Sequence, residues 1–584
     1  MNRKASGTFS GDPIEALRLA EKDHLMGGAG LLREGRHHRR LEEKPFTEEQ
    51  RSKTTILFGS ITPKHEAFIK AVFEGCGYRC QNLPTPTNSV LQTGREYCNN
   101  GLCNPNYYTA GNLIQYLREL QKQGLERQQI NDGYLHFSAG GCGPCRFGMY
   151  ESEYRQALHN AGFPGFRVIT FQSNRVIREG SEQPGLEYTM DLGLGSLNAL
   201  ILGDLLYGMT YQIRPYEVRA GETNRAMEEC VQELADFLRS RPRFEILERT
   251  PRWFSRRLQH KKTYKNLLNN FGKFHEHLYG KAYQAILARC SKRLHQIEVD
   301  RTRPKPIVKI VGEFFSQIQE SDANFNVFSF LEKEGAEVAV DSMTSLLQYW
   351  LYFAQLQQQA RQGLVGPYES PAWWQLRRLL ANRVASLKKP LLFKMASRIY
   401  ARQFHRIAEQ LGGLARPLPP QEELDRLARP FFNPLIEGGE GHLEVAKSIY
   451  YTTHHLCHMV LALKPFGCMP STQSDGVMAS VASRFDGLLF LSIETSGEGE
   501  INAQSRIQMA LGEAHRKARA EFERALQSTG KRLEDIREYV FSHPELRRPF
   551  YRFPRRPETV GNAANFIQHV SDLMDRKASR QIGR

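Results

Sequence analysis

The sequence predicts an α/β protein: two Rossmann- or flavodoxin-like lobes with parallel sheets, a helical insertion and long flanking helices. Two observations carry this prediction. Short apolar runs alternate with amphipathic helical patterns in two separate stretches of the chain, an alternation typical of parallel sheets with helices on both faces. Between these stretches the alternation gives way to long helical patterns, which we interpret as an insertion between the lobes.

The composition agrees with a folded protein of several domains. The chain has 584 residues, of which 40% are hydrophobic and 24% charged, enough to bury sizeable cores. No run approaches the eighteen or more apolar residues typical of a membrane helix. The N-terminal sequence MNRKASGTFSGDPIEAL lacks the apolar core of a signal peptide. We therefore expect a cytoplasmic protein with no membrane partner.

The first lobe is predicted over residues 53–192, after a polar N-terminal arm over residues 1–52. Strands are expected where short apolar runs close on glycine or on a polar turn. These runs lie at residues 54–60, 79–84, 133–141 and 166–171. Helical patterns between them cover residues 65–78, 112–121 and 149–161.

Residues 193–305 are predicted to form a helical, basic insertion. Residues 247–303 carry 14 Lys and Arg against 4 Asp and Glu. Cations interleaved with aromatic residues are typical of nucleic-acid contacts. They could also bind the anionic, nucleotide-like part of a cofactor. The ordinary interpretation is a solvated helical face with its aromatic side chains inward. Nucleic acid is therefore not the expected partner.

The second lobe is predicted over residues 306–540. Strands are expected at residues 306–315, 337–340 and 487–494, and helices at residues 342–362, 373–411 and 441–465. The last of these helices leads to the turn FGCMPS, and further helices follow the third strand. Residues 541–584 are basic and interrupted by proline, so we interpret them as a tail.

Five cysteines lie on three loops that also carry glycine or proline. Cys98 and Cys103 belong to REYCNNGLCNP, Cys142 and Cys145 to GGCGPC, and Cys468 to PFGCMP. Ligands of open α/β sheets collect at the carboxyl ends of the strands. The loop of Cys142 and Cys145 follows a predicted strand directly, which makes these loops the candidate site.

Several kinds of site use such cysteines. Soft thiolates select zinc, copper(I) or iron–sulfur clusters. The Cys-x4-Cys and Cys-x2-Cys pairs lie about forty residues apart, so zinc is one interpretation. Cys-Gly-Pro-Cys before a helix is also similar to a thioredoxin-type dithiol. A second cysteine loop favours a cluster, while zinc, a redox dithiol and plain loop cysteines remain open.

Two glutamates are weaker catalytic candidates. Glu494 and Glu498 lie in ETSGEGEIN, directly after a predicted strand. Carboxylates placed there can serve as a general acid or base, although an ordinary strand-to-helix loop is at least as good an interpretation. No G-x-x-x-x-G-K-[ST] phosphate loop occurs in the sequence.

The set NNGLCNP, GPCRFGMY, PFGCMPS and IETSGEGEIN resembles the 2-hydroxyacyl-CoA dehydratase and activase-related proteins. The closest resemblance is to the cluster-binding portion of the large acyl-CoA dehydratase activase-related chains, and it covers about Thr47 to Leu526. It implies α/β lobes that hold an iron–sulfur cluster, [4Fe–4S] or double-cubane. Cys103, Cys145 and Cys468 are the implied ligands, with Cys98 or Cys142 completing the set, or with both serving a larger cluster.

The resemblance also implies partners and a reaction. An actin-like ATPase acting in trans would inject a low-potential electron, because this chain lacks the ATPase modules of its larger relatives. The electron would serve acyl-CoA dehydration or a related reduction, and a homologous second subunit or a homodimer is expected. One alternative is a double-cubane-type reductase of small substrates that does not handle CoA esters. The other is a non-catalytic zinc- or nucleic-acid-binding protein.

Overall fold

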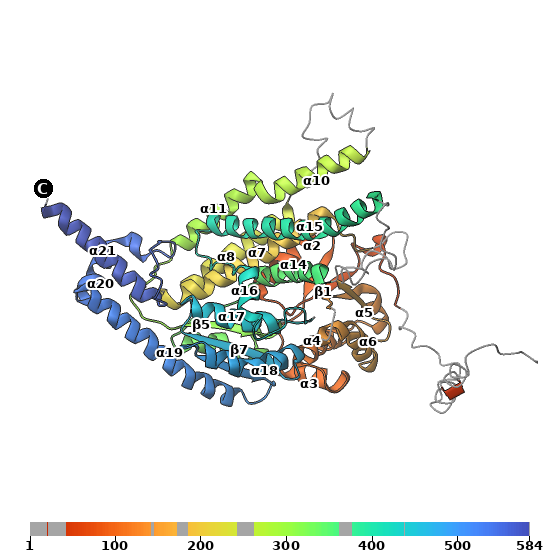
Figure 1. Ribbon diagram of the computed structural model, residues 1–584. Helices are drawn as coiled ribbons and strands as arrows, with labels where there is room; N and C mark the ends of the chain where they lie inside the picture. Colours follow the sequence, from red (N-terminus) through yellow and green to blue (C-terminus); the bar gives the residue numbers. More distant parts are fainter. Residues whose placement is uncertain are drawn as a thin grey trace, which may run out of the picture. The chain divides into compact units, whose positions relative to one another are not determined.

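A computed structural model of the chain describes residues 20–21, 43–141, 145–171, 185–241, 262–360, 376–436 and 438–582. The chain divides into two compact units, Met1–Lys44 and Pro45–Arg584. Every helix and strand named below lies in the second unit (Figure 1).

The first lobe is built on a four-stranded parallel sheet with the order β2-β1-β3-β4. Its strands are β1 (Thr55–Phe58), β2 (Arg79–Asn82), β3 (Tyr134–Ala139) and β4 (Arg167–Phe171). Its helices and 3-10 turns are η1 (Glu48–Gln50), α2 (Pro63–Gly75), α3 (Asn88–Tyr97), α4 (Asn104–Lys122), α5 (Arg127–Gly133), η2 (Arg146–Met149) and α6 (Tyr150–Asn160). The four predicted strands are confirmed.

Two glycines bring α3 and α4 into close contact. A Cβ atom on Gly94 would lie 2.0 Å from the carbonyl oxygen of Tyr107, and one on Gly111 would lie 1.9 Å from that of Val90. Only glycine permits backbones to approach this closely. The short loop between the two helices, which carries Cys98 and Cys103, is therefore held tightly at its base.

The insertion after the first lobe is helical, as predicted. Its elements are α7 (Met190–Ile213), η3 (Arg214–Tyr216), α8 (Glu222–Ser240), α10 (Lys262–Tyr279) and α11 (Lys281–His295). In the described part of the chain, Met190–Tyr216 is the one helical stretch long and apolar enough to cross a membrane, and 72% of its most apolar window is buried inside the protein. Helix α7 therefore serves as a core helix.

The second lobe repeats the strand order of the first, as β6-β5-β7-β8, and all pairs are parallel. Its strands are β5 (Ile307–Gly312), β6 (Glu337–Ala339), β7 (Met459–Pro465) and β8 (Phe490–Thr495). Its helices and turns are α12 (Phe314–Ile318), η4 (Asp322–Asn324), α13 (Val327–Lys333), α14 (Met343–Ala360), α15 (Leu376–Gln410), α16 (Gln421–Ala428), α17 (Gly441–Thr453), α18 (Met469–Arg484) and α19 (Glu500–Thr529). The predicted α/β class with two parallel-sheet lobes is confirmed.

One predicted helix is wrong in its second half. The sequence predicts a helix over residues 441–465, but α17 ends at Thr453 and residues 459–465 form β7. All seven residues of β7 are buried. A strand buried on both faces has no alternating pattern, so periodicity alone cannot separate it from a buried helix.

The C-terminal segment also differs from the predicted tail. After α20 (Leu533–Ser542) and η5 (Pro544–Arg547), the chain forms α21 (Asn562–Ile582). Phe566 and Ile567 of α21 are fully buried in a hydrophobic cluster that also contains Phe522 of α19 and Ile536 of α20. The basic residues of this segment therefore lie around a packed apolar face.

Candidate functional site

Three of the five predicted cysteines stand immediately before helical turns. Cys103 precedes α4, Cys145 precedes η2 after β3, and Cys468 precedes α18 after β7. Proline occupies the first turn of both α4 and α18, where its missing N–H costs nothing. The strand order is the same in both lobes, so the loops of Cys145 and Cys468 occupy equivalent places in the two sheets.

The three loops touch one another. The backbone N–H of Asn104 donates to the carbonyl oxygen of Phe466 at 3.1 Å, and Arg146 Nη1 donates to the carbonyl oxygen of Gly467 at 2.6 Å. A Cβ atom on Gly467 would lie 3.4 Å from Cys103 Cα. Residues adjacent to Cys103, Cys145 and Cys468 are thus in direct contact.

The three thiols share their electrostatic surroundings. Burial raises the pKa of Cys103, Cys145 and Cys468, and the nearby Glu313 carboxylate raises all three pKa values further. The pKa of Cys145 reaches about 12. Glu440 adds to this effect on the pKa of Cys145 and Cys468. Thiols in this state are protonated at neutral pH unless a cation stabilises the thiolate.

Glu313 and Glu440 were not predicted from the sequence. Glu313 follows β5 directly and accepts a hydrogen bond of 3.1 Å from the Ser316 amide. Glu440 is the residue before α17. Burial raises the pKa of both carboxyls, and Glu313 raises that of Glu440 further. A carboxyl group placed directly after a buried strand was the sequence signal for Glu313.

A tyrosine contacts one of the thiols. Tyr150 at the start of α6 is buried, and its hydroxyl lies 3.1 Å from Cys103 Sγ. Burial raises the pKa of Tyr150 well above its ordinary value, so the hydroxyl keeps its proton and can donate it to a thiolate. Hydrogen bonds to ligand sulfurs are one of the means by which proteins set cluster potentials.

The other two predicted cysteines are not placed in this group. Cys98 directly follows α3, and the charge that acts on it is Glu153 rather than Glu313. Burial raises the pKa of Cys98 to about 12. Cys142 lies outside the described residues.

Thiolate donors bind either single soft metal ions or iron–sulfur clusters. Within the described ranges, no three Cys, His, Asp or Glu side chains are grouped so that they could hold one metal ion. A zinc site needs its ligands around a single ion, with Zn–S distances of about 2.3 Å. An iron–sulfur cluster carries several irons and is held by thiolates from separate positions. Here three thiols on three loops lie close together. Their number and chemistry suit an iron–sulfur cluster better than a single zinc ion.

The weaker candidates Glu494 and Glu498 lie near this site without joining it. Glu494 is an exposed residue of β8. The side chain of Glu498 is 72% exposed and pairs with Arg95 of α3 at 3.0 Å. Glu498 therefore helps to join the rim of the second lobe to the first lobe.

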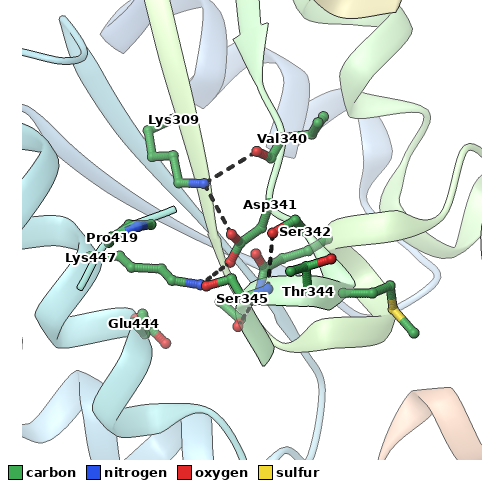
Figure 2. Close-up of polar contacts among 12 residues, drawn as sticks. Lys309, Val340, Asp341, Ser342, Thr344, Ser345, Pro419, Glu444 and Lys447 are labelled. Carbon is green, nitrogen blue, oxygen red and sulfur yellow. Dashed lines mark hydrogen bonds and ion pairs between the residues drawn. The ribbon is translucent and has the colours of Figure 1, made fainter. Parts of the chain in front are cut away.

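A second polar group lies beside the site, at the carboxyl ends of β5 and β6. Asp341 follows β6 and stands between two buried lysines, Lys309 of β5 and Lys447 of α17 (Figure 2). Burial alone would raise the pKa of Asp341, but the two lysines outweigh it and hold the pKa at about 2. The carboxylate is therefore charged at neutral pH.

The basic insertion presents apolar side chains to solvent. Tyr264, Leu267 and Phe271 of α10 are 61–70% exposed. Residues 242–261, which carry part of the basic run, lie outside the described residues. The expectation that the aromatic side chains all point inward is therefore wrong for α10.

Comparison with known protein families, with curated proteins and with solved structures found no match to this chain. The residues of the site themselves thus carry the functional argument.

Proposed function

We propose that this chain is an iron–sulfur protein of the 2-hydroxyacyl-CoA dehydratase/activase system. In this proposal Cys103, Cys145 and Cys468 bind the cluster, and an actin-like ATPase acting in trans supplies a low-potential electron. The contact of the three cysteine loops is the observation that supports it most strongly, because it brings soft thiol donors of both lobes together, two of them in the loops that follow β3 and β7.

The surrounding residues suit such a cofactor. A bound iron–sulfur cluster would hold the electron and pass it on to an acyl-CoA substrate. The Tyr150 hydroxyl would donate a hydrogen bond to the thiolate of Cys103. Burial raises the pKa of Glu313 and Glu440, so these carboxyls can stay neutral beside thiolates and avoid like-charge repulsion.

The fourth ligand is proposed to come from the loop of Cys145. Cys142 is three residues from Cys145 in that loop, whereas Cys98 is acted on by a different carboxylate from the other three thiols. We therefore favour Cys142 over Cys98, and a single [4Fe–4S] cluster over a double-cubane one. The ratio of iron to protein separates the two cluster types.

Anaerobic purification followed by iron and sulfide analysis tests the proposal. The full chain should contain both elements and absorb visible light. Cys145→Ala and Cys468→Ala should each lose most of the iron. The matched control is Cys457→Ala, which should keep its iron. Cys457 is 9% and Cys468 is 8% exposed, so the two thiols are equally buried. Cys457 lies before β7, however, whereas Cys468 lies after it, where the proposed site is.

Two outcomes would contradict the proposal. A folded, colourless wild-type chain without iron after anaerobic isolation would refute the cluster. Unchanged iron in both Cys145→Ala and Cys468→Ala would refute the ligand assignment. Binding of an acyl-CoA ester, measured by calorimetry, then distinguishes the dehydratase role from reduction of small substrates.

A further inference from the structure

Two cysteines outside the candidate site meet between helices α8 and α11 of the insertion. Cys230 of α8 and Cys290 of α11 are both fully buried in the core that packs against the first sheet. The Cys230 thiol lies 3.8 Å from the backbone carbonyl oxygen of Cys290, to which it donates. Both are free thiols. Cys230 therefore contacts Cys290 directly, although residues 231–289 separate them in the chain.

The two sulfurs also contact each other. The Cys290 thiol donates a hydrogen bond to the sulfur of Cys230, which lowers the pKa of Cys230 and raises the pKa of Cys290. A disulfide places its two sulfurs about 2.0 Å apart. Thiols that are already in hydrogen-bond contact need only a short approach to reach that distance, so this pair is well placed to form a disulfide.

An arginine distinguishes the two thiols. Arg293, one turn after Cys290 on α11, donates from Nη1 to Cys230 Sγ at 3.9 Å and lowers the pKa of Cys230 further. Burial and the Glu233 carboxylate act in the opposite direction, but the two donors outweigh them. A cation and a thiol that donate to the same sulfur stabilise its thiolate. Cys230 is therefore the nucleophile of the pair, and Cys290 keeps its proton.

Arg293 also lies between Cys230 and solvent. Its side chain is 28% exposed, whereas Cys230, which it contacts, is fully buried. Arg293 pairs with Glu229 at 2.9 Å and with Glu233 at 2.7 Å, and these carboxylate side chains are 53% and 33% exposed. Ion pairs as exposed as these are weak. Rotation of the arginine side chain thus gives a molecule as small as hydrogen peroxide a route to Cys230.

We propose that Cys230 and Cys290 are a peroxide-sensitive thiol pair that closes to a reversible disulfide between α8 and α11. The Cys230 thiolate attacks one oxygen of hydrogen peroxide and the O–O bond breaks. Cys230 becomes a sulfenic acid, while the departing hydroxide takes up a proton to form water. The Cys290 thiol then attacks the sulfenic sulfur, forms the S–S bond and releases a second water. The two sulfurs lose two electrons in total, and the peroxide gains them.

The bond would join two helices of the insertion covalently. It closes a loop over residues 231–289, and such a cross-link restricts the unfolded chain. Oxidation should therefore raise the thermal midpoint, and a dithiol reductant should restore the original value. Neither cysteine belongs to the candidate site, so the inference does not depend on the proposed function.

Peptide mapping of the folded full chain after brief exposure to hydrogen peroxide tests the pair. After alkylation of the remaining thiols and digestion with trypsin, residues 226–239 and 290–292 should appear joined, and dithiothreitol should separate them. Cys457 is the internal control. It is 9% exposed and thus more accessible than Cys230, so peroxide limited by access alone would oxidise it first. The peptide of Cys457 should instead remain alkylated.

Two variants test the roles of the two thiols. In Cys290→Ala, the sulfenic acid on Cys230 meets no attacking thiol, and dimedone should trap it at least about tenfold faster than at Cys457 in the same chain. In Cys230→Ala, dimedone labelling of Cys290 should stay at the level of Cys457. Circular dichroism confirms that both variants are folded.

The wild-type chain decides the proposal without either variant. A cross-link that is absent from the folded chain, or that forms only at urea concentrations that unfold it, would overturn the disulfide. Faster labelling of Cys290 in Cys230→Ala than of Cys230 in Cys290→Ala would overturn the assignment of the nucleophile. Iron analysis of the same chain decides the proposed function separately, because the cross-linked peptides are identified whether or not iron is present.

Discussion

The amide N–H of Asn104 donates a hydrogen bond of 3.1 Å to the carbonyl oxygen of Phe466. Asn104 follows Cys103 in the first lobe, and Phe466 lies two residues before Cys468 in the second. The side-chain Nδ2 of Asn104 also donates to the carbonyl oxygen of Thr495 at 2.9 Å. A single residue thus fixes one cysteine loop of the first lobe to the ends of two strands of the second.

Replacement of Gly467 by alanine should weaken this contact. Gly467 has φ +75°, and a Cβ atom there would lie 3.0 Å from the carbonyl oxygen of Leu102. Strained backbone of this kind costs about 1–3 kcal/mol, so the free energy of unfolding in urea should fall by that amount. Gly476→Ala in α18 is the control, because its Cβ meets open space, and it should be neutral or stabilising. Equal urea midpoints for both variants would contradict this account.

Asp204 should be a main contributor to stability between the insertion and the second lobe. Its carboxylate on α7 accepts from the amides of Met343 and Thr344, both at 2.7 Å, at the start of α14. Asp204→Ala leaves these buried donors without an acceptor, at a cost of about 2 kcal/mol or more. Asp236→Ala, at a 60% exposed ion pair, should change the free energy of unfolding by less than about 0.5 kcal/mol. Similar losses in both variants would argue against a capping role.

Phe566 of α21 should behave as a core residue. It is fully buried, and truncation of a buried phenylalanine costs about 3–5 kcal/mol. Phe566→Ala should therefore lower the thermal midpoint strongly. Phe541 on neighbouring α20 is 71% exposed, and Phe541→Ala should leave the midpoint nearly unchanged. If the C-terminal segment were an unpacked tail, both substitutions would change the thermal midpoint only slightly, which would contradict this prediction.

Glu66 should make stability fall as the pH rises. It accepts from the Ile61 amide at 3.3 Å, yet burial raises its pKa from 4.5 to about 8. A raised pKa in the folded state gives stability that is complete below about pH 4.5 and is lost as the pH rises through about 8. The glutamine of Glu66→Gln cannot ionise. Between pH 4.5 and about pH 8 the free energy of unfolding of the wild type should therefore fall by more than that of the variant, and the difference should exceed about 1 kcal/mol.

Urea unfolding of both proteins across this pH range measures the difference. Glu119→Gln, at a 54% exposed side chain of α4, should follow the wild-type curve. Parallel curves for wild type and Glu66→Gln would show that ionisation of this carboxyl does not limit stability.

Most of the fold could be predicted from the sequence, because local patterns determine it. The strands at residues 54–60 and 133–141 end in glycine and lie between amphipathic helices, so their pattern is clear. The strand at residues 459–465 could not be recognised, since every residue of it is buried, Lys464 included. Its lysine is tolerated because Glu444 and Asp475 pair with it, and no local pattern contains these contacts.

The candidate site was predictable only in part. Only the loop of Cys145 could be placed by the rule that strands of a parallel sheet end on one side, because the strand before Cys468 was not recognised and the loop of Cys103 joins two helices. The role of Glu313 and Glu440 depends on burial and on the approach of α17, which Gly439 and Gly441 permit by packing against Pro470. These contacts join distant parts of the chain, so the sequence carries no local sign of them.

Helix α7 has a consequence for how the protein folds. Its residues Leu202 and Leu205 belong to the core against the first sheet, while Tyr207 and Tyr211 belong to the core of the second. If either lobe unfolded, one apolar face of this shared helix would become exposed to solvent. The two lobes should therefore melt in one cooperative transition, and a fragment cut at the lobe boundary would carry an exposed apolar face and aggregate on expression.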